Sequence, residues 1–564
     1  MSWKIAEKYR RILAGEEGSV VKGWGGKLTV CLVYPNHYRT GMSNLGFQAV
    51  YALLNDCQDV VCERAFLPEP TDLAEYAASN TRLLSLETQR PLADFDLIAF
   101  SVSFETDYLH IPQLLALANI PPLASERSSA FPLVIAGGAA LFLNPEPVAE
   151  FIDLICLGEG EVLIPKLLDL LRTSSDGERS AFLRTAATCP GMYVPSFYTV
   201  SYDGDAVTAI RPAEGLSPCV QRQWAAELDT AQTGSQLFTP ETEFGDMYLV
   251  ELSRGCPRGC RFCAAGFIYE PYRQRSLESV REQVRKALER HQRIGLVGAA
   301  VGDFRKIGQL CRFIRDEGGK VSVASLRIDA LDDEMIRVLV ESGHKTVSLA
   351  PEGASQRLRT MIRKGITREQ ILDAAERLIS HDILNLKLYF IVGFPGETMA
   401  DLEEMVQLVE DIRSQMAATA RGNRRLGQLT LSVNPFVPKP FTPFQWCGME
   451  RAAILEKKAA FLRKTCGRLP NVRVQFEGIK EAVFQALLSR GDRRLASLLL
   501  KAGETGSWRR AARDLGVDLE RQVCRTIPLD EVLPWDIICC DKRERLLHEY
   551  RLALDGTPPE GVES

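Results

Sequence analysis

The chain has 564 residues, of which 46% are hydrophobic and 25% are charged. At ~150 residues per domain this length predicts three to four globular domains and excludes a single small binding module, while the composition excludes a disordered, collagen-like or coiled-coil chain. The 68 Lys and Arg against 73 Asp and Glu give a net charge of −5, which predicts no strong attraction to nucleic acid or to an anionic membrane.

The 15 cysteines are spread along the chain rather than grouped as a disulfide framework. Residues 1–13 carry charges throughout and lack the apolar core of a signal peptide. The longest apolar run, 133–143, is well short of the ~20 residues that span a bilayer. We therefore expect a cytoplasmic protein without a membrane span, whose thiols are reduced and are either buried or metal ligands.

The first part of the chain reads as an α/β domain. Strands that are apolar on both faces and alternate with helices indicate a parallel sheet covered on both sides. Residues 1–189 carry such strands at 27–34, 96–103, 132–136 and 153–157. This pattern predicts a Rossmann-like domain that binds its ligand beyond the carboxyl ends of the strands.

Residues 190–246 lose the helical periodicity and are expected to connect two domains through short strands, with a hairpin tip at Asp203 and Gly204. A second α/β run covers residues 247–448. Its six predicted strands begin at Met247, Ile294, Lys320, Thr346, Asn385 and Gln428. This run favours a full or partial barrel, whose chemistry lies at the carboxyl ends of the strands. Residues 449–564 are expected to form a small, mostly helical domain.

Three cysteines follow the first strand of the second run with the spacing CxxxCxxC: Cys256, Cys260 and Cys263. Three thiolates on one short loop suit three corners of an iron–sulfur cluster, whose fourth iron stays open to substrate. A structural zinc site is a less favoured alternative because it needs four ligands and the nearest other cysteines are Cys219 and Cys311. Three buried, unligated cysteines and a simple ferredoxin are further alternatives.

With Phe262 directly before the third cysteine, this loop resembles the signature of the radical S-adenosylmethionine (radical SAM) superfamily. In that family a partial (β/α)6 barrel holds a four-iron, four-sulfur cluster after its first strand. The resemblance extends from Met247 to Phe436 and implies that Cys256, Cys260 and Cys263 ligate the cluster. It implies that the open iron binds S-adenosylmethionine, whose reductive cleavage gives a 5′-deoxyadenosyl radical, and that a one-electron donor such as flavodoxin or ferredoxin supplies the electron.

The same resemblance implies that residues at the strand ends bind S-adenosylmethionine. The candidates are Phe262, Ser325, Arg327, Glu352, Gly393 and Gly396. An ion pair at the barrel mouth is the alternative for Arg327 and Glu352, and a turn before a helix is the alternative for the two glycines. After the second strand the family usually has a Gly-Gly-Glu-like stretch, whereas this chain has Gly298 to Asp303.

A Rossmann-like domain ahead of such a barrel is similar to the cobalamin-dependent subfamily, where it positions a corrinoid over the cluster. The resemblance implies that Gly41, Ser43, Gly137 and Gly138 hold cobalamin, because small residues let a flat macrocycle lie against the backbone. His37 lacks the Asp and Gly neighbours of the cobalt-binding motif Asp-x-His-x-x-Gly. A domain that binds nothing is the alternative.

The sequence therefore predicts a radical SAM enzyme that methylates an unactivated carbon with the help of cobalamin. A cobalamin-independent radical SAM enzyme, acting by isomerisation, oxidation or modification of RNA or peptide, is the first alternative. A non-catalytic iron–sulfur or zinc scaffold is the second. Methylthiotransferases carry three further cluster cysteines in their first domain, and Cys31, Cys57 and Cys62 do not form a convincing equivalent. The substrate and the catalytic residues are left open.

Overall fold

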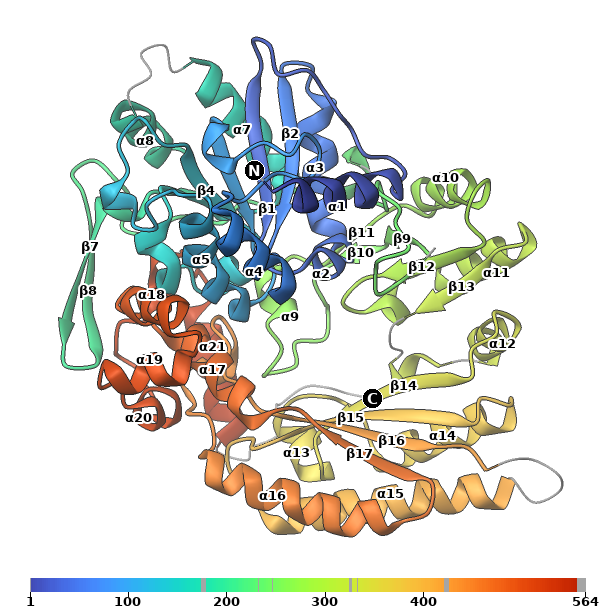
Figure 1. The fold of residues 1–564 in the computed structure, drawn as a ribbon. Helices are drawn as coiled ribbons and strands as arrows, with labels where there is room; N and C mark the ends of the chain where they lie inside the picture. Colours follow the sequence, from blue (N-terminus) through green and yellow to red (C-terminus); the bar gives the residue numbers. More distant parts are fainter. Residues whose placement is uncertain are drawn as a thin grey trace.

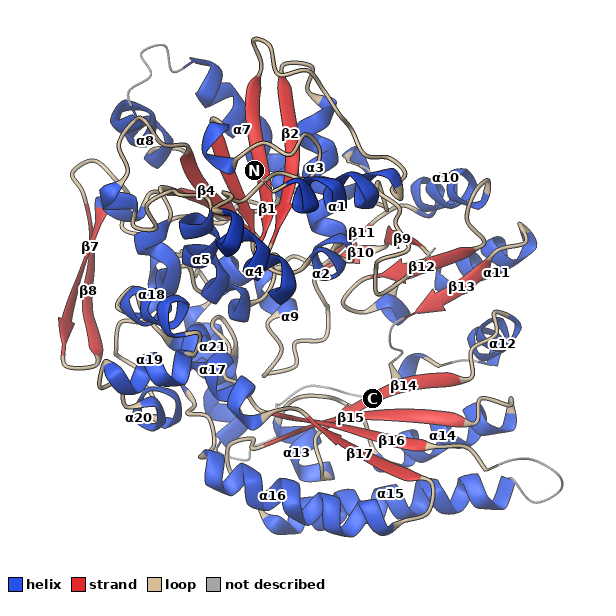
Figure 2. Cartoon of the chain, viewed as in Figure 1, coloured by secondary structure: helices blue, strands red, loops and turns tan. Residues whose placement is uncertain are grey.

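The structure is a computed structural model that describes residues 2–173, 179–231, 233–245, 247–323, 327–331, 333–419 and 426–554. Three regions follow one another along the chain (Figure 1): an α/β domain, a split barrel of parallel strands and a region of short helices. Figure 2 shows the helices that flank the strands in the first two regions. The predicted fold class is confirmed. Within the ranges given, no helix is long and apolar enough to cross a membrane.

A six-stranded sheet with the order β2-β1-β3-β4-β5-β6 forms the amino-terminal domain. Its strands are β1 (Leu28–Tyr34), β2 (Val60–Phe66), β3 (Leu97–Ser101), β4 (Leu133–Gly137), β5 (Leu154–Cys156) and β6 (Met192–Tyr193). The first five are parallel, and β6 runs antiparallel to β5. The strand order reverses between β1 and β3, and open α/β sheets bind ligands outside the carboxyl ends at such a reversal.

Two layers of helices cover this sheet. One face carries α3 (Leu45–Asp56), α7 (Gly160–Thr173) and α8 (Arg179–Ala187). The other carries α1 (Trp3–Ala14), α4 (Pro70–Ser79) and α5 (His110–Leu117). Both faces of β1 are therefore buried, which is why its sequence is apolar almost throughout.

The sequence does not predict β2, because Glu63 and Arg64 interrupt its apolar run. The structure nevertheless buries every residue of this strand. Arg64 is neutralised by Glu16 at 2.6 Å and by Glu87 at 2.7 Å, and all three side chains are fully buried. Because a buried charge is tolerated only with a partner, these ion pairs are what allow a charged sequence to form an interior strand.

The barrel consists of two separate parallel sheets. One contains β9 (Tyr248–Glu251), β12 (Arg293–Val297) and β13 (Lys320–Val323). The other contains β14 (Thr346–Glu352), β15 (Asn385–Val392), β16 (Leu429–Pro435) and β17 (Val472–Phe476). No strand pairing joins β13 to β14 in the part of the chain that the structure describes, so the barrel is split there (Figure 1).

All six strands predicted for the barrel are present, and β17 is a seventh that pairs in parallel with β16. The sheet thus runs beyond the boundary expected at residue 448. The alternation of half-buried and exposed residues in β17 reflects its place at the edge of the sheet. Such a short, half-polar run gives little sequence signal in a segment that is otherwise helical.

The barrel helices begin at clear capping residues. Ser276, Ser355 and Thr367 precede α10 (Leu277–Leu288), α13 (Gln356–Met361) and α14 (Arg368–Ser380), and each side chain accepts a hydrogen bond from a backbone N–H three residues later. The remaining barrel helices are α11 (Ile307–Asp316), α12 (Asp333–Glu341), α15 (Met399–Thr419) and α16 (Ala452–Thr465). In Figure 1, α15 and α16 lie along the outer face of the four-stranded sheet.

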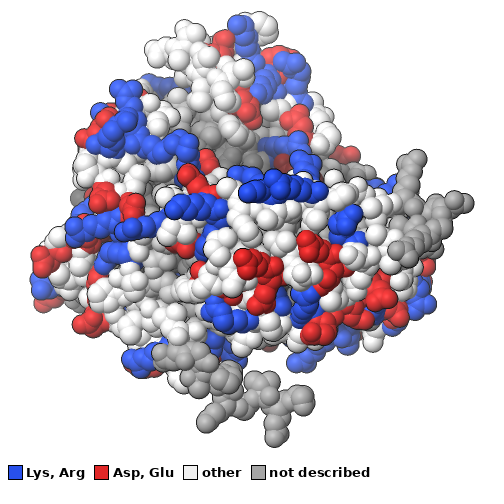
Figure 3. All heavy atoms as spheres, turned by 90° about the horizontal axis from the view of Figure 1, so that it is seen from below, with Lys and Arg blue, Asp and Glu red and all other residues white. Residues whose placement is uncertain are grey.

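The carboxy-terminal region packs against both other regions. Its helices are α17 (Ile479–Arg490), α18 (Leu495–Thr505), α19 (Trp508–Asp514), α20 (Leu519–Cys524) and α21 (Arg543–Leu554). Asn144 of the first domain donates to the carbonyl oxygen of Gly491 at 2.7 Å, and Glu146 pairs with Arg493 at 2.8 Å. On the face seen from below, basic and acidic side chains are interspersed (Figure 3), in line with their near balance in the sequence.

The connector holds a hairpin of β7 (Tyr198–Asp203) and β8 (Ala206–Pro212), as predicted. It is also tied to the carboxy-terminal region by a disulfide between Cys219 and Cys539. The expectation that all thiols are reduced is wrong for this pair. Val220 donates to the carbonyl oxygen of Ile537 at 2.7 Å and accepts from the N–H of Cys539 at 3.0 Å, so backbone pairing brings the two segments together.

Candidate active site

The loop with the three cysteines connects β10 (Ser253–Arg254) to α9 (Ala265–Ile268). Gly255 and Gly259 have φ angles of 81° and 65°, in the region that favours glycine. A Cβ atom on Gly255 would lie 2.6 Å from the carbonyl oxygen of Tyr269. The glycine beside Cys256 therefore allows the loop to pass close to the chain that follows α9.

Cys256, Cys260 and Cys263 are free, half-buried thiols. Burial raises the pKa of Cys263 to about 11, and the nearby Cys260, Cys256 and Glu352 raise it as well. In the described residues, no three His, Cys, Asp or Glu side chains are arranged to hold a single metal ion. A four-iron cluster instead takes each thiolate on a different iron, and three soft thiol donors on one loop fit this chemistry.

Aromatic side chains stand next to the third cysteine at the barrel mouth. The ring of Phe262 meets that of Phe394 edge to face, with centroids 5.7 Å apart. Phe394 in turn lies 5.1 Å from Phe436, which contacts Phe444. These four rings form a continuous apolar cluster, in which Phe262 is half-buried and the other three rings are buried.

The turn after β15 contains Gly393 and Gly396, with φ angles of 87° and 71°. The N–H of Gly393 donates to Glu397 at 2.7 Å. Lys458 of α16 donates to the same carboxylate oxygen at 2.7 Å, and both of these charged side chains are buried. Turn formation accounts for both glycines, and the Glu397–Lys458 pair, which the sequence does not reveal, fixes the shape of the turn.

Glu352 and Arg327 each have another partner and do not pair with each other. Arg327 donates to Asp329 at 2.9 Å. Glu352 accepts from Lys364 at 3.4 Å, and burial raises its pKa although Lys364 opposes this. Glu352 also has a φ of 64°, and such backbone strain in a non-glycine residue is concentrated at functional sites. Ser325, the other residue expected here, lies outside the described residues.

The segment after β12 contacts the cysteine loop where the family usually has Gly-Gly-Glu. Asp303 pairs with Arg258, which lies between the first two cysteines. A Cβ atom on Gly298 would lie 2.9 Å from the hydroxyl oxygen of Ser253, so a glycine is needed for close packing against β10. This segment supports the loop through these contacts.

A cavity of about 870 Å³ lies between the first domain and the barrel. Part of it is an apolar slot between the sheet and two helices, lined from β1, β3, β4, α3 and α7 by residues such as Leu32, Ala99, Ile135, Leu54 and Leu167. The strand ends line a second part, through Asn44, Ser101, Ser103, Gly137 and Gly158. The wall from the barrel includes Ser253, Arg254, Gly255, Tyr269 and Gly298. The cavity thus reaches the residue before Cys256.

The candidate cobalamin residues divide into two pairs. Gly137 and Gly138 line the cavity, and a Cβ atom on Gly138 would lie 2.3 Å from the carbonyl oxygen of Val102. Gly41 and Ser43 are not among the lining residues. A Cβ atom on Gly41 would meet the ring of Phe66 at 2.6 Å. The hydroxyl of Ser43 donates to the carbonyl oxygen of Arg39 and accepts from the N–H of Glu243.

The sequence-based choice therefore misses Asn44, Leu45 and Gly46, which directly follow Ser43 and line the cavity. The side chain of Asn44 caps α3 by accepting from the N–H of Phe47 at 2.9 Å. It donates to Ser103 at 2.9 Å, so it links the ends of two strands. An Asn before a helix is a recognisable cap, but the sequence does not show that it faces a cavity.

His37 also lies outside the cavity lining. Its Nδ1 atom is 3.1 Å from the carbonyl oxygen of Leu67 and 3.5 Å from Glu69. This agrees with the absence of a cobalt-binding motif around His37 in the sequence.

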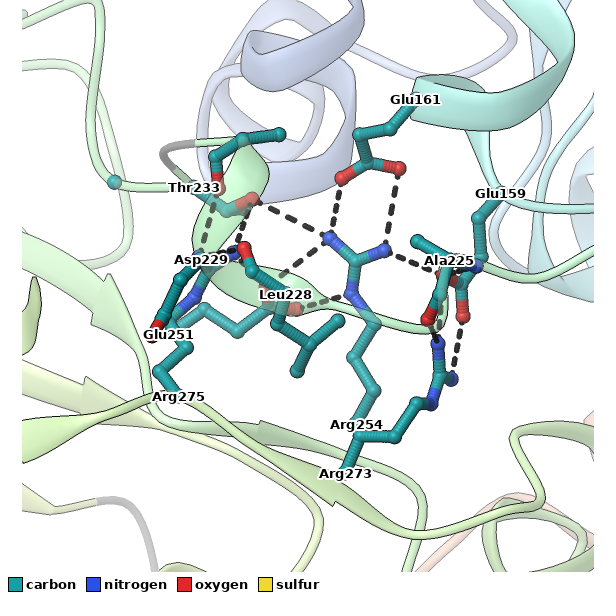
Figure 4. A network of polar contacts seen from close by, with 12 residues as sticks. Glu159, Glu161, Ala225, Leu228, Asp229, Thr233, Glu251, Arg254, Arg273 and Arg275 are labelled. Carbon is teal, nitrogen blue, oxygen red and sulfur yellow. Dashed lines mark hydrogen bonds and ion pairs between the residues drawn. The ribbon is translucent and has the colours of Figure 1, made fainter.

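A network of buried and half-buried charges joins the first domain to the barrel at the edge of this cavity (Figure 4). Arg254 donates to Glu251 at 2.8 Å, to Glu159 at 2.9 Å and to Glu161 at 2.5 Å. Arg273 makes two further hydrogen bonds to Glu159, at 2.6 and 2.9 Å. Burial raises the pKa of Glu159 and Glu161, but hydrogen bonds and charge from these arginines outweigh it, so both pKa values are lowered.

Two family profiles match the chain: "Radical SAM proteins, N-terminal" over residues 46–195 and "Radical SAM superfamily" over residues 250–409. "Uncharacterized protein MJ0966" of Methanocaldococcus jannaschii is 29% identical over 83% of this chain and 90% of its own length. A tRNA-2-methylthio-N(6)-dimethylallyladenosine synthase of Geobacillus thermodenitrificans is 26% identical over 38% of this chain and 43% of its own length.

"Uncharacterized methyltransferase PH0819" of Pyrococcus horikoshii is 25% identical over 53% of this chain and 63% of its own length. Among solved structures, the cobalamin-dependent S-adenosylmethionine radical enzyme OxsB has a TM-score of 0.46 and 17% identity, over 68% of this chain and 52% of its own. The second profile includes the cysteine loop and the strands β9 and β12 to β15. The chain belongs to the radical SAM superfamily and is a radical SAM enzyme.

Proposed function

We propose that this radical SAM enzyme uses cobalamin to methylate an unactivated carbon. The observation that carries the proposal is the cavity of about 870 Å³ that leads from the interior of the first domain to the cysteine loop. Ligand pockets of this size hold large organic molecules. The apolar slot would take the aromatic base of a cobalamin, and the part of the cavity at the strand ends is where its macrocycle would lie.

The lining of the cavity supports this choice of ligand. The apolar slot between β3 and α7, with Ala99 and Leu167 among its walls, suits an aromatic base. Gly137 and Gly138 at the end of β4 expose backbone without side chains, which lets a flat ring lie close to the chain. Asn44 and Ser103 add polar groups that would meet the amide side chains of a corrin. The residues present therefore fit the cofactor.

Each part of the site has a distinct task in this proposal. When bound, the cluster supplies the electron that cleaves S-adenosylmethionine, and cobalamin supplies a carrier for the methyl group. Cys256, Cys260 and Cys263 hold the iron–sulfur cluster, and the apolar rings that begin with Phe262 lie beside Cys263. The turn at Gly393 presents backbone groups to S-adenosylmethionine, as do the other candidate residues Arg327, Glu352 and Gly396.

The charged network holds the two cofactor sites at a fixed distance from each other. Arg254 lies two residues before Cys256 and holds Glu159 and Glu161 of the first domain. Because these charges are largely shielded from water and mutually paired, the network resists relative movement of the two regions. A fixed separation between the cavity and the cysteine loop is what a transfer between two cofactors requires.

Occupancy of the cavity can be tested by filling it. Ala99→Phe places a ring in the apolar slot. We expect it to weaken binding of hydroxocobalamin at least ~10-fold, because the ring occupies the space that the ligand needs and the packed walls cannot move apart without strain. Ala99→Ser leaves the volume almost unchanged and serves as the matched control. Retention after anaerobic gel filtration, read by visible absorbance, measures binding, and iron content reports on the cluster separately.

Two outcomes would contradict the cobalamin proposal. Wild-type protein that retains no corrinoid would favour the cobalamin-independent radical enzyme. Equal retention by the two Ala99 variants would place cobalamin elsewhere.

A separate assay tests whether the protein is catalytic at all. Formation of neither 5′-deoxyadenosine nor S-adenosylhomocysteine by reduced, cluster-loaded protein would favour a non-catalytic scaffold.

A methylthiotransferase reaction has less support. Such an enzyme needs a second cluster held by cysteines of the first domain, but Cys31 and Cys62 are fully buried within β1 and β2. Burial raises the pKa of both thiols well above its ordinary value. Cys57 is half-buried at the end of α3, and none of the three lines the cavity.

A further inference from the structure

The last helix of the described residues, α21, forms one ion pair with the cysteine loop itself, and the helix and the residue before it form three more with neighbouring segments. Glu549 accepts from Arg261 at 2.9 Å and from Arg363 at 2.7 Å. Nearer the start of the helix, Lys542 and Arg545 pair with Glu270 at 2.6 and 3.0 Å. A helix more than 270 residues away in sequence therefore contacts both ends of the loop segment that follows Cys256.

Arg261 is the most constrained of these side chains. It stands directly after Cys260 and is only 3% exposed. Its backbone N–H donates to the carbonyl oxygen of Ile362 at 3.0 Å, and its guanidinium donates to that of Met361 at 2.7 Å. Among the described residues, Glu549 is the one carboxylate with which it forms an ion pair. A buried guanidinium without a counter-charge is strongly disfavoured, so the position of Arg261 depends on Glu549.

We propose that Glu549 is a positioning residue for the iron–sulfur cluster. By holding Arg261, it fixes the backbone between the second and third cysteines, Cys260 and Cys263, so the carboxy-terminal helix completes the cluster site. This proposal rests on membership of the radical SAM superfamily and is independent of cobalamin.

The other contacts of α21 allow this role to be tested separately from folding. Trp446 and Tyr550 pack edge to face with ring centroids 5.6 Å apart, and Leu546 is 2% exposed. These apolar contacts keep the helix docked when Glu549 is changed. The pairs with Glu270 involve partly exposed lysine and arginine side chains, and such pairs contribute little to stability.

The test compares Glu549→Gln with Glu544→Gln, which neutralises an exposed carboxylate on the same helix. We expect reduced E549Q to release iron to a ferrous chelator ~10-fold faster than wild type, because a buried charge-assisted hydrogen bond has been lost. Its cluster potential should rise, because the positive charge of Arg261 no longer has a counter-charge. The electron paramagnetic resonance spectrum of the reduced cluster in E549Q should change accordingly. E544Q should match wild type in all three measurements. Glu549→Asp keeps the carboxylate and should therefore retain part of the wild-type iron retention and potential.

Iron release, potential and spectrum of E549Q that all match wild type would overturn the proposal. Equal changes in E544Q would also overturn it, since the effect would then come from net charge. If E549Q does not accumulate as folded protein, Arg261→Lys takes its place, because it keeps the charge and removes the planar donor that meets Glu549. Wild-type iron release and spectrum in that variant would likewise contradict the proposal. None of these measurements depends on corrinoid binding.

Discussion

Replacing Arg254 with methionine is expected to open the interface between the first domain and the barrel. The magnitude follows from the partners that remain. Glu159 keeps Arg273, and Glu251 keeps Arg275 at 2.8 Å, whereas Glu161 has no other ion pair among the described residues. One carboxylate, whose side chain is 19% exposed, is therefore left without an ion pair. Because it keeps part of its hydration, we expect a cost of ~3 kcal/mol, the lower end of the range for a fully buried charge.

Hydrogen exchange measured by mass spectrometry is the suitable assay, because a chain of several regions does not unfold in a single step. A cost of ~3 kcal/mol corresponds to roughly 100-fold faster exchange, since each ~1.4 kcal/mol is a factor of ten. We expect this change in peptides around β5 and β11 (Arg273–Gln274). Peptides from α15, on the far side of the barrel, should be unchanged.

The double variant Arg254→Met/Glu161→Gln separates the proposed cause from a simple loss of packing. Removing the orphaned carboxylate should restore most of the protection, because the penalty lies in the unpaired charge. Protection in R254M that equals wild type would refute the reasoning. A double variant as open as R254M would show that the unpaired carboxylate is not the cause.

The pH dependence of hydrogen-exchange protection at this interface should also have the opposite sign in R254M and in the wild type. In the wild type the pKa of Glu161 is lowered by Arg254 although burial opposes this, so its contribution is present above ~pH 4.3 and is lost as the pH falls through the lowered pKa. In R254M the hydrogen bond and charge of Arg254 are lost, so burial, which is the largest influence, raises this pKa against the weaker opposing effects of a backbone hydrogen bond and of Arg275. Protonation then relieves the buried charge, so the interface of R254M should become more protected as the pH falls.

Two further variants and one labelling experiment test other parts of the structure. Lys458→Met should weaken binding of S-adenosylmethionine ~10-fold in calorimetry, because the turn at Gly393 loses its buried ion pair; unchanged affinity would contradict this. Burial raises the pKa of Asp107 to about 7. Asp107→Asn should therefore be more stable than wild type by ~1–2 kcal/mol at pH 8, where the buried aspartate is charged, and should lose this advantage towards pH 4. A difference in thermal unfolding that does not change with pH would refute the pKa shift. Alkylation of denatured, unreduced protein should miss only Cys219 and Cys539; labelling of both would exclude the disulfide.

The sequence predicts most of the fold, because long apolar strands that alternate with helices leave a strong local pattern. It fails at β2, where Arg64 interrupts the run and is neutralised by Glu16 and Glu87 from other segments. It also fails at β17, an edge strand whose exposed alternate residues include Arg473. In both cases the deciding interaction is with a segment distant in sequence, which a local pattern does not record.

The sequence likewise predicts one part of the candidate site, the cysteine loop, and does not predict the other, the cavity. The prediction that Cys256, Cys260 and Cys263 ligate a cluster could be made from sequence, because it depends only on their spacing on one short loop. The cavity is not readable, since its walls come from many separate elements of the first domain, from the connector and from the barrel. Asn44 lines it while the neighbouring Ser43 does not, and only the packed structure distinguishes such adjacent residues.

By itself, then, the sequence determined the class of chemistry and the order of the regions, because both depend on local spacing and periodicity. The tertiary structure alone decided how the regions cooperate. Arg254 meets Glu161 across 93 residues, Arg261 meets Glu549 across 288, and Cys219 meets Cys539 across 320. None of these residues stands out in the sequence, and its role comes from the partner that folding brings beside it in a place partly shielded from water, where electrostatic pairing is stronger than in solvent.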